Sequence, residues 1–207
     1  MTDYVLVGGG AFARELLDWF SPVFGAEERF AGYLMDEGYD AGKLADRLPR
    51  LGDVAGYRPQ EGQALVLAVG APKDKRTLVE ALADRAPRFA TLLHPRAWVS
   101  ASARIGQGVT VCPFGSVSAD AMLEDFVTLN AFAGAGHDVT VGRFSTLSAY
   151  VDLTGGVRLA EGCFVGSGAR VLPGVSIGED CTVGAGAVVV RSAKPGKTLY
   201  AAPARTL

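Results

Sequence analysis

Apolar and polar positions in roughly the first ninety residues predict alternating strands and helices. Short apolar runs at residues 4–7, 30–34 and 65–69 have the length and composition of buried strands. Residues 12–20 carry apolar side chains three or four positions apart, which is the spacing of one helical face, and a second helix is expected over about 75–83. This alternation predicts a small parallel sheet with helices on its faces.

From Trp98 onward, helical spacing disappears and an aliphatic residue recurs at every sixth position. Of these sixteen positions, all but one are Val, Ile or Leu, and the residue two before each is small or valine throughout. The sixteen are Val99, Ile105, Val111, Val117, Leu123, Leu129, Ala135, Val141, Leu147, Leu153, Leu159, Val165, Val171, Ile177, Val183 and Val189. An unbroken hexapeptide repeat is the signature of a parallel β-helix, whose stacked coils bury the aliphatic row as a core.

We therefore expect an α/β + β chain: a small N-terminal Rossmann-like βαβ domain at residues 1–93, followed by a left-handed parallel β-helix at residues 94–207. In the left-handed β-helix that the repeat resembles, three hexads form one triangular coil, so that residues 18 apart lie above one another. The repeat then predicts about five coils.

The stacking rule places five outward-facing aromatic residues in two columns. Phe114, Phe132 and Tyr150 form one column, and Phe126 and Phe144 form the other. Because aromatic ladders would leave a large apolar patch on a monomer, we expect them to be covered. A subunit interface is the expected cover, and the alternative is the N-terminal domain or a loop.

Composition excludes several classes of partner. With 20 Lys and Arg against 22 Asp and Glu among 207 residues and no basic cluster, nothing favours binding to nucleic acid or an anionic membrane. No apolar run is long enough to span a bilayer, and the N-terminus lacks the pattern of a signal peptide, so a cytoplasmic protein is expected. The three cysteines and two histidines have no metal-ligand spacing, so no metal site is predicted.

His137 is the strongest candidate for a catalytic residue. The register points it outward, Asp138 follows it, and the stacking rule places Gly155 and Gly156 directly above this pair. Glycines leave a slot with accessible backbone N–H groups over an imidazole whose ordinary pKa lies near neutrality, which suits a general base. Asn130, also outward, is a candidate polar neighbour, although turns favour asparagine for its conformation alone.

A glycine-rich turn predicts a nucleotide site in the N-terminal domain. Gly8, Gly9 and Gly10 follow the first strand, and Ala13 completes the pattern G-x-G-x-x-A at the start of a helix. This arrangement lets a phosphate approach the helix N-terminus, although tight turns also use glycine for geometry alone. Asp36, near the end of the second strand, is placed to hold a ribose or a base. Three or four strands suit one nucleotide better than a dinucleotide.

Over essentially its whole length the chain resembles the sugar O-acyltransferase family, which includes the sialic acid O-acetyltransferases and the bacillosamine and perosamine N-acetyltransferases. The resemblance is carried by the hexads together with VGGGAFARE from Val7, FAGYLMDE from Phe30, AVG from Ala68, His94-Pro95, residues 130–138 and the closing APAR from Ala202. It implies homotrimers with acetyl-coenzyme A (acetyl-CoA) between the β-helices of neighbouring subunits, and a nucleotide-sugar held by the N-terminal domain.

Carried over by position, the resemblance assigns roles to individual residues. His137 would be the base, Asp138 its acidic neighbour, Asn130 a group on the substrate side, and Gly155 a backbone N–H facing the thioester. The nucleotide would be held by Gly8, Gly9, Gly10, Asp36 and Glu37, and the pantetheine arm of acetyl-CoA by Gly166, Ser167, Ala185 and Gly186. The chain departs from some members at Gly136, where they carry an acid.

The expected activity is transfer of acetyl from acetyl-CoA to an amino group of a nucleotide-linked deoxysugar, and we expect the acceptor to be the 4-amino group. The transfer is expected to be direct, with both substrates bound in a ternary complex. The alternatives are sugar O-acetylation and a non-catalytic assembly that binds nucleotide-sugars. A nucleotidyltransferase would need a larger N-terminal domain. A γ-type carbonic anhydrase needs three histidine ligands, which a trimer with one histidine per subunit at a shared site could supply, but it leaves the glycine turn unexplained. The sequence leaves open the acceptor atom, the sugar, the nucleobase and the pathway.

Overall fold

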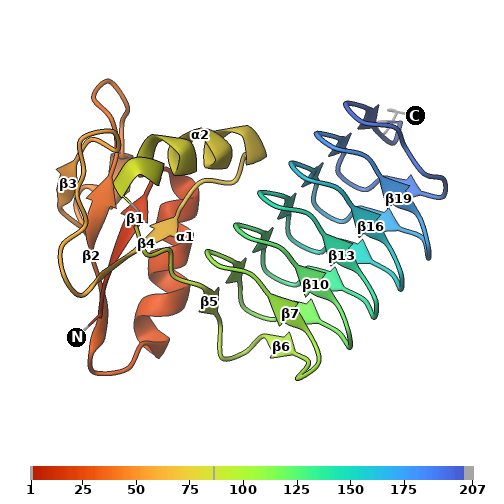
Figure 1. Cartoon of the computed structure of the whole chain (residues 1–207), viewed down its shortest axis with the longest axis horizontal. Helices are drawn as coiled ribbons and strands as arrows, with labels where there is room; N and C mark the ends of the chain where they lie inside the picture. Colours follow the sequence, from red (N-terminus) through yellow and green to blue (C-terminus); the bar gives the residue numbers. More distant parts are fainter. Residues whose placement is uncertain (1, 86, 203–207) are drawn as a thin grey trace, which may run out of the picture.

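The computed structural model describes residues 2–85 and 87–202, which form a small α/β unit followed by a column of stacked coils (Figure 1). The α/β unit holds a four-stranded parallel sheet and two α-helices. Its elements are β1 (Thr2–Val7), α1 (Ala11–Phe20), β2 (Glu28–Leu34), β3 (Arg50–Gly52), β4 (Gln63–Leu67) and α2 (Pro72–Leu82). The predicted strands and helices are confirmed with boundaries shifted by a few residues, and the short edge strand β3 was not expected.

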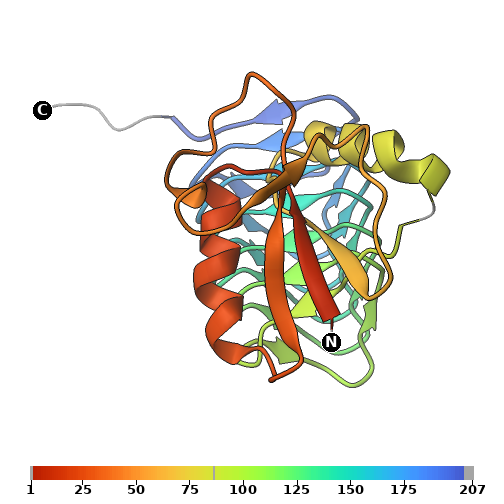
Figure 2. The same ribbon diagram turned by 90° about the vertical axis from the view of Figure 1, so that its left-hand side faces the viewer.

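The sheet has the strand order β3-β2-β1-β4, and its two faces are covered differently. Along β1, Tyr4 and Leu6 belong to the cluster that packs against α1. Val5 and Val7 belong to a second cluster with Leu82 of α2. Figure 2 shows α1 and α2 on opposite sides of the sheet, with the coils behind it. Alternating side chains on a parallel strand buried on both faces produce the continuous apolar run seen in the sequence.

The coils form a left-handed parallel β-helix whose three flat faces are parallel sheets, which confirms the predicted fold. The first face contains β5 (Leu92–Leu93), β8 (Thr110–Val111), β11 (Thr128–Leu129), β14 (Thr146–Leu147), β17 (Phe164–Val165), β20 (Thr182–Val183) and β22 (Thr198–Leu199). The second contains β6 (Trp98–Val99), β9 (Ser116–Val117), β12 (Gly134–Ala135), β15 (Asp152–Leu153), β18 (Arg170–Val171) and β21 (Val188–Val189). The third contains β7 (Arg104–Ile105), β10 (Met122–Leu123), β13 (Thr140–Val141), β16 (Arg158–Leu159) and β19 (Ser176–Ile177).

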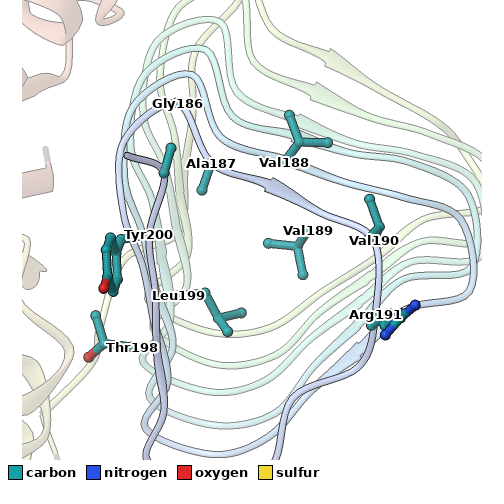
Figure 3. Close-up of a pocket in the computed structure, with 10 residues that line it drawn as sticks. Gly186, Ala187, Val188, Val189, Val190, Arg191, Thr198, Leu199 and Tyr200 are labelled. Carbon is teal, nitrogen blue, oxygen red and sulfur yellow. The ribbon is translucent and has the colours of Figure 1, made fainter. Parts of the chain in front are cut away.

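From β5 to β21 each strand pairs with the strand 18 residues away, as Thr128 does with Thr146, so the predicted stacking rule holds there. The last strand, β22, lies 16 residues after its partner β20. The aliphatic row points inward and forms one continuous core. Figure 3, a view of the C-terminal coil, shows Val189 and Leu199 pointing into the triangular section and Val188 pointing out of it. Three corners join the faces. We call them the aromatic corner (130–133 in the middle coil), the histidine corner (136–139) and the docking corner (142–145).

The two aromatic columns have different surroundings. On the aromatic corner the rings stack face to face, with centroids 4.9 Å apart for Phe114 and Phe132 and 4.8 Å apart for Phe132 and Tyr150, and all three side chains are exposed. On the docking corner, Phe126 and Phe144 are buried in the cluster that contains Val5 and Val7 of β1. The expectation of a subunit interface is therefore wrong for this second column, because the chain's own N-terminal sheet covers it.

His94 is buried where the α/β unit meets the first coil. Its Nδ1 accepts the backbone N–H of Arg96 at 3.0 Å, its Nε2 lies 3.2 Å from the carbonyl oxygen of Trp19, and its ring meets Phe20 edge-on. These partners require a neutral ring with the proton on Nε2. Burial lowers the pKa of His94 below 6.5. His94 is thus a turn residue that ties α1 to the β-helix.

Acid should therefore weaken the folded chain through His94. Because the folded pKa lies below the unfolded value, the unfolded chain binds more protons, and stability present above about pH 6.5 is lost as the pH falls. The contribution reaches at most about 1.4 kcal/mol per pH unit. Urea unfolding between pH 7.5 and 5 should show a shallower pH dependence for His94→Asn than for the wild type. Equal slopes would contradict this role.

Candidate active site

A pocket of about 360 Å³ opens at the carboxyl ends of β1, β2 and β4. Strand order in the sheet reverses between β1 and β4, and the helices that follow these two strands cover opposite faces. Parallel α/β sheets bind ligands at such a reversal, because the loops diverge there and leave a crevice. The lining residues are Gly8, Gly9, Gly10, Leu34, Met35, Asp36, Tyr39, Asp40, Val54, Val69, Asp74, Thr77 and Leu78.

The turn that lines this pocket must be built from glycines, because side chains at two of its positions would collide with neighbouring residues. A Cβ on Gly8 would lie 2.6 Å from Val69 Cγ1, and one on Gly9 would lie 2.7 Å from Met35 Sδ. Gly8 also has φ +110°, a conformation that favours glycine. Gly10 is the N-cap of α1, so the first free N–H groups of that helix face the turn. The turn can therefore bring an anion close to the backbone.

The acidic residues of the pocket differ in part from those expected. Asp36 lines it, and one of its carboxylate oxygens accepts the backbone N–H of Val54 at 2.8 Å, which leaves the other available to a ligand. Asp40 and Asp74 also line it, and sequence analysis did not find them because they lie on a loop and on α2, away from the glycine motif. Glu37 is exposed and is not among the lining residues.

His137 extends from the histidine corner into solvent, with its side chain 71% exposed. Its Nδ1 lies 2.8 Å from Asp138 Oδ2, and Asp138 adopts the left-handed conformation (φ 59°) that brings its carboxylate beside the ring. Because Nδ1 then carries the proton donated to the carboxylate, Nε2 keeps its lone pair. The outward orientation and the acidic partner are both as predicted.

The glycines above His137 are packed against it. A Cβ on Gly155 would lie 2.3 Å from His137 Nε2, and the carbonyl oxygen of His137 accepts the N–H of Gly156 at 2.9 Å. The N–H of Gly155 has no acceptor within residues 2–85 and 87–202. A Cβ at Gly136 would lie 2.9 Å from the carbonyl oxygen of Leu153. The imidazole thus lies directly beneath Gly155, whose missing side chain leaves room for the ring.

The remaining predicted residues lie on a different corner. Asn130, Gly166, Ser167, Ala185 and Gly186 follow strands of the first face and belong to the aromatic corner, whereas His137 and Gly155 follow strands of the second. Asn130 Oδ1 accepts the N–H of the next residue, Ala131, at 2.7 Å. A single chain therefore does not bring Asn130 or the predicted pantetheine residues to His137.

A further regularity links these two corners. The aromatic column is continued above Tyr150 by Gly168 and Gly186, and the column that contains Asp138 is continued by Gly156 and Gly174. All of these residues have positive φ, so the backbone shape of each corner is the same from coil to coil, whereas this one position carries no side chain in the upper coils. The 18-residue spacing of these glycines is visible in the sequence, although the pattern shared by the two corners was not predicted.

The cysteines do not offer a nucleophile. Cys163 and Cys181 are buried in the β-helix core, as predicted, and their Sγ atoms contact the carbonyl oxygens of Gly178 and Lys194. Burial raises the pKa of Cys163 to about 11, which keeps its thiol protonated at neutral pH. A covalent acyl-cysteine intermediate is therefore disfavoured.

Residues 156–191 match the family described as bacterial transferase hexapeptide (six repeats). The acetyltransferase domain of PglB from Neisseria gonorrhoeae FA1090 is 27% identical to the chain, with 100% of both chains covered and a TM-score of 0.86. A histidine-to-asparagine mutant of perosamine N-acetyltransferase from Caulobacter crescentus, in complex with CoA and GDP-perosamine, is 31% identical over 99% of this chain and 96% of that chain, with a TM-score of 0.87. No curated protein sequence matches significantly.

WeeI from Acinetobacter baumannii AYE, 22% identical with 100% of both chains covered and a TM-score of 0.84, shares the fold. Identity above 30% over nearly the whole length, together with the hexapeptide match, places the chain in a known class. The chain belongs to the hexapeptide-repeat sugar acyltransferase family. Within the described ranges, no helix is long and apolar enough to cross a membrane. Residues 203–205 of the closing APAR motif lie outside the described residues.

Proposed function

We propose that the chain transfers acetyl from acetyl-CoA to an amino group of a nucleotide-linked deoxysugar, and we expect this to be the 4-amino group. Residues 1–93 would hold the nucleotide, and residues 94–207 would carry out the transfer. The observation that carries the proposal is His137, with Nδ1 bound to Asp138 and Nε2 packed beneath Gly155, where any side chain would collide with the ring. Similarity to an N-acetyltransferase complexed with CoA and GDP-perosamine supports both substrates.

The geometry suits a direct transfer. The sugar amine attacks the thioester carbonyl carbon while His137 Nε2 accepts the proton that the nitrogen loses. The Gly155 N–H would stabilise the oxyanion that develops on the carbonyl oxygen. When the carbon–sulfur bond breaks, the thiolate takes up a proton and leaves as the CoA thiol. Asp138 holds the productive tautomer throughout.

We place this site between two copies of the chain, in a homotrimer. Asn130 and the glycines of the aromatic corner cannot reach His137 within one chain, because they follow a different face of the prism. The exposed ladder of Phe114, Phe132 and Tyr150 lies on that same corner and would be buried by a neighbour's histidine corner. Above the ladder the bare glycines leave room for an extended pantetheine arm.

Charge placed on the ladder should therefore separate the subunits. We expect Phe132→Glu to shift the chain from trimer to monomer in analytical ultracentrifugation and to lose activity, because a carboxylate would be buried between stacked rings. Leu51→Glu, a matched change at an exposed leucine of the edge strand β3, should leave a trimer. A monomeric wild type, or a trimeric Phe132→Glu variant with full activity, would contradict the shared site.

The activity itself is tested by following thiol release from acetyl-CoA with UDP-, GDP- and dTDP-linked 4-amino sugars. Release with at least one of them, accompanied by an acetylated amine in the product, is expected. Turnover of hydroxyl acceptors alone would make the chain an O-acetyltransferase. Binding of the nucleotide-sugar without any thiol release would favour the non-catalytic assembly.

A further inference from the structure

A lysine of the α/β unit is completely buried against the β-helix. Lys75 lies in the first turns of α2 and has no exposed surface. Its Nζ donates to the carbonyl oxygen of Phe126 at 3.0 Å, to Thr128 Oγ1 at 2.7 Å and to the carbonyl oxygen of Ser145 at 3.2 Å. Three acceptors match the three donors of an ammonium group, and they come from two successive coils.

Burying the Lys75 ammonium group costs free energy, and close packing at this position does not require a charged side chain. Among the described residues, no carboxylate accepts from Lys75, and burial lowers the pKa of Lys75 to about 7. A methionine would fill similar space without removing a charge from water. In some proteins, buried polar groups of this kind fix one arrangement among several that apolar contacts would allow. The three bonds of Lys75 connect α2 to two coils in one defined position.

The residues on either side of Lys75 connect that placement to the nucleotide pocket. Asp74, Thr77 and Leu78 form the α2 wall of the pocket. Arg76 pairs with Glu161 and Asp180 of the upper coils, each at 3.1 Å. Figure 1 shows α2 reaching from the sheet to the coils. One helix thus carries both the pocket wall and the attachment to the column.

We propose that Lys75 is a positioning residue that locks α2 to two coils of the β-helix and thereby sets where the nucleotide end of the acceptor is held. The inference rests on the proposed function, because it assigns the pocket to the acceptor. The inference predicts different effects on the two substrates. Acceptor binding depends on Lys75, whereas acetyl-CoA binding at the corners of the β-helix does not.

Two isosteric substitutions test the lock. Thr128→Val removes one acceptor of Lys75 and keeps the side-chain shape. Thr146→Val is its matched control, because Thr146 pairs with Thr128 on the next coil and its buried hydroxyl has no partner within the described part of the chain. Lys75→Met removes all three bonds. KM for each substrate, nucleoside diphosphate affinity by calorimetry, and amide hydrogen exchange of α2 are measured for each variant.

We expect Lys75→Met to raise the acceptor KM about tenfold and Thr128→Val about threefold, since hydrogen bonds to charged groups are among the stronger ones. The KM for acetyl-CoA should stay within about twofold, and Thr146→Val should match the wild type. Should Lys75→Met fail to fold, Thr128→Val decides. Equal acceptor KM and equal α2 exchange in Thr128→Val and Thr146→Val would overturn the inference.

A wild type that binds no nucleoside diphosphate would refute the acceptor assignment instead. In that case α2 exchange still decides whether Lys75 forms the lock, since faster exchange in Thr128→Val than in Thr146→Val would support it and equal exchange would reject it.

Discussion

We expect replacement of His137 with alanine to lower kcat about a thousandfold, within the range that a positioned general base contributes. The variant loses the only imidazole on the histidine corner and leaves the attacking amine without a proton acceptor. The KM values for both substrates change little, because the ring is exposed and supports no packing. Steady-state thiol release from acetyl-CoA measures both parameters.

Folding should not confound this result. Ala119 occupies the equivalent position one coil below His137, so alanine suits this corner of the prism. Thermal unfolding and sedimentation of the variant should match those of the wild type. A His137→Ala variant that retains most of its kcat would remove the base assignment, and proton transfer would then have to use another group or solvent.

Gly155→Ala should lower kcat about a hundredfold without loss of stability, the size of effect expected when a reacting group is displaced by about 1 Å. The added Cβ would lie 2.3 Å from His137 Nε2, so the exposed ring must turn away from the slot. Gly155 is not among the glycines with positive φ, so alanine is compatible with its backbone.

Gly56→Ala is the matched control for that variant, because an added Cβ there meets nothing within 4 Å. It should leave kcat unchanged. If Gly155→Ala retained full activity, the imidazole would not need the slot beneath residue 155.

The architecture was predictable because its physical cause is local and repeated. Each hexad supplies one inward aliphatic residue, and the 18-residue stacking then follows from three hexads per coil, as the pairing of Thr128 with Thr146 shows. The same rule correctly placed Gly155 above His137. The glycine turn could be predicted from the sequence because its close packing against Val69 and Met35 permits only residues without a Cβ, and this leaves a glycine motif in the chain.

The rest depended on contacts that have no sequence period. Burial of Phe126 and Phe144 requires knowing which face the N-terminal sheet covers. Asp40 and Asp74 come from a loop and a helix that meet only at the pocket. Lys75 looks in the sequence like an ordinary helical surface residue, and only the fold places its ammonium group against two coils.

The central claim is that His137 acts on an acetyl group held between subunits. A crystal structure of the chain with CoA and a nucleotide-linked amino sugar tests it most directly. The account predicts the CoA sulfur at the histidine corner, between two copies, and the sugar amine within about 3 Å of Nε2 or joined to it through one water. A CoA sulfur bound away from this corner, or an imidazole turned away from both substrates, would contradict it.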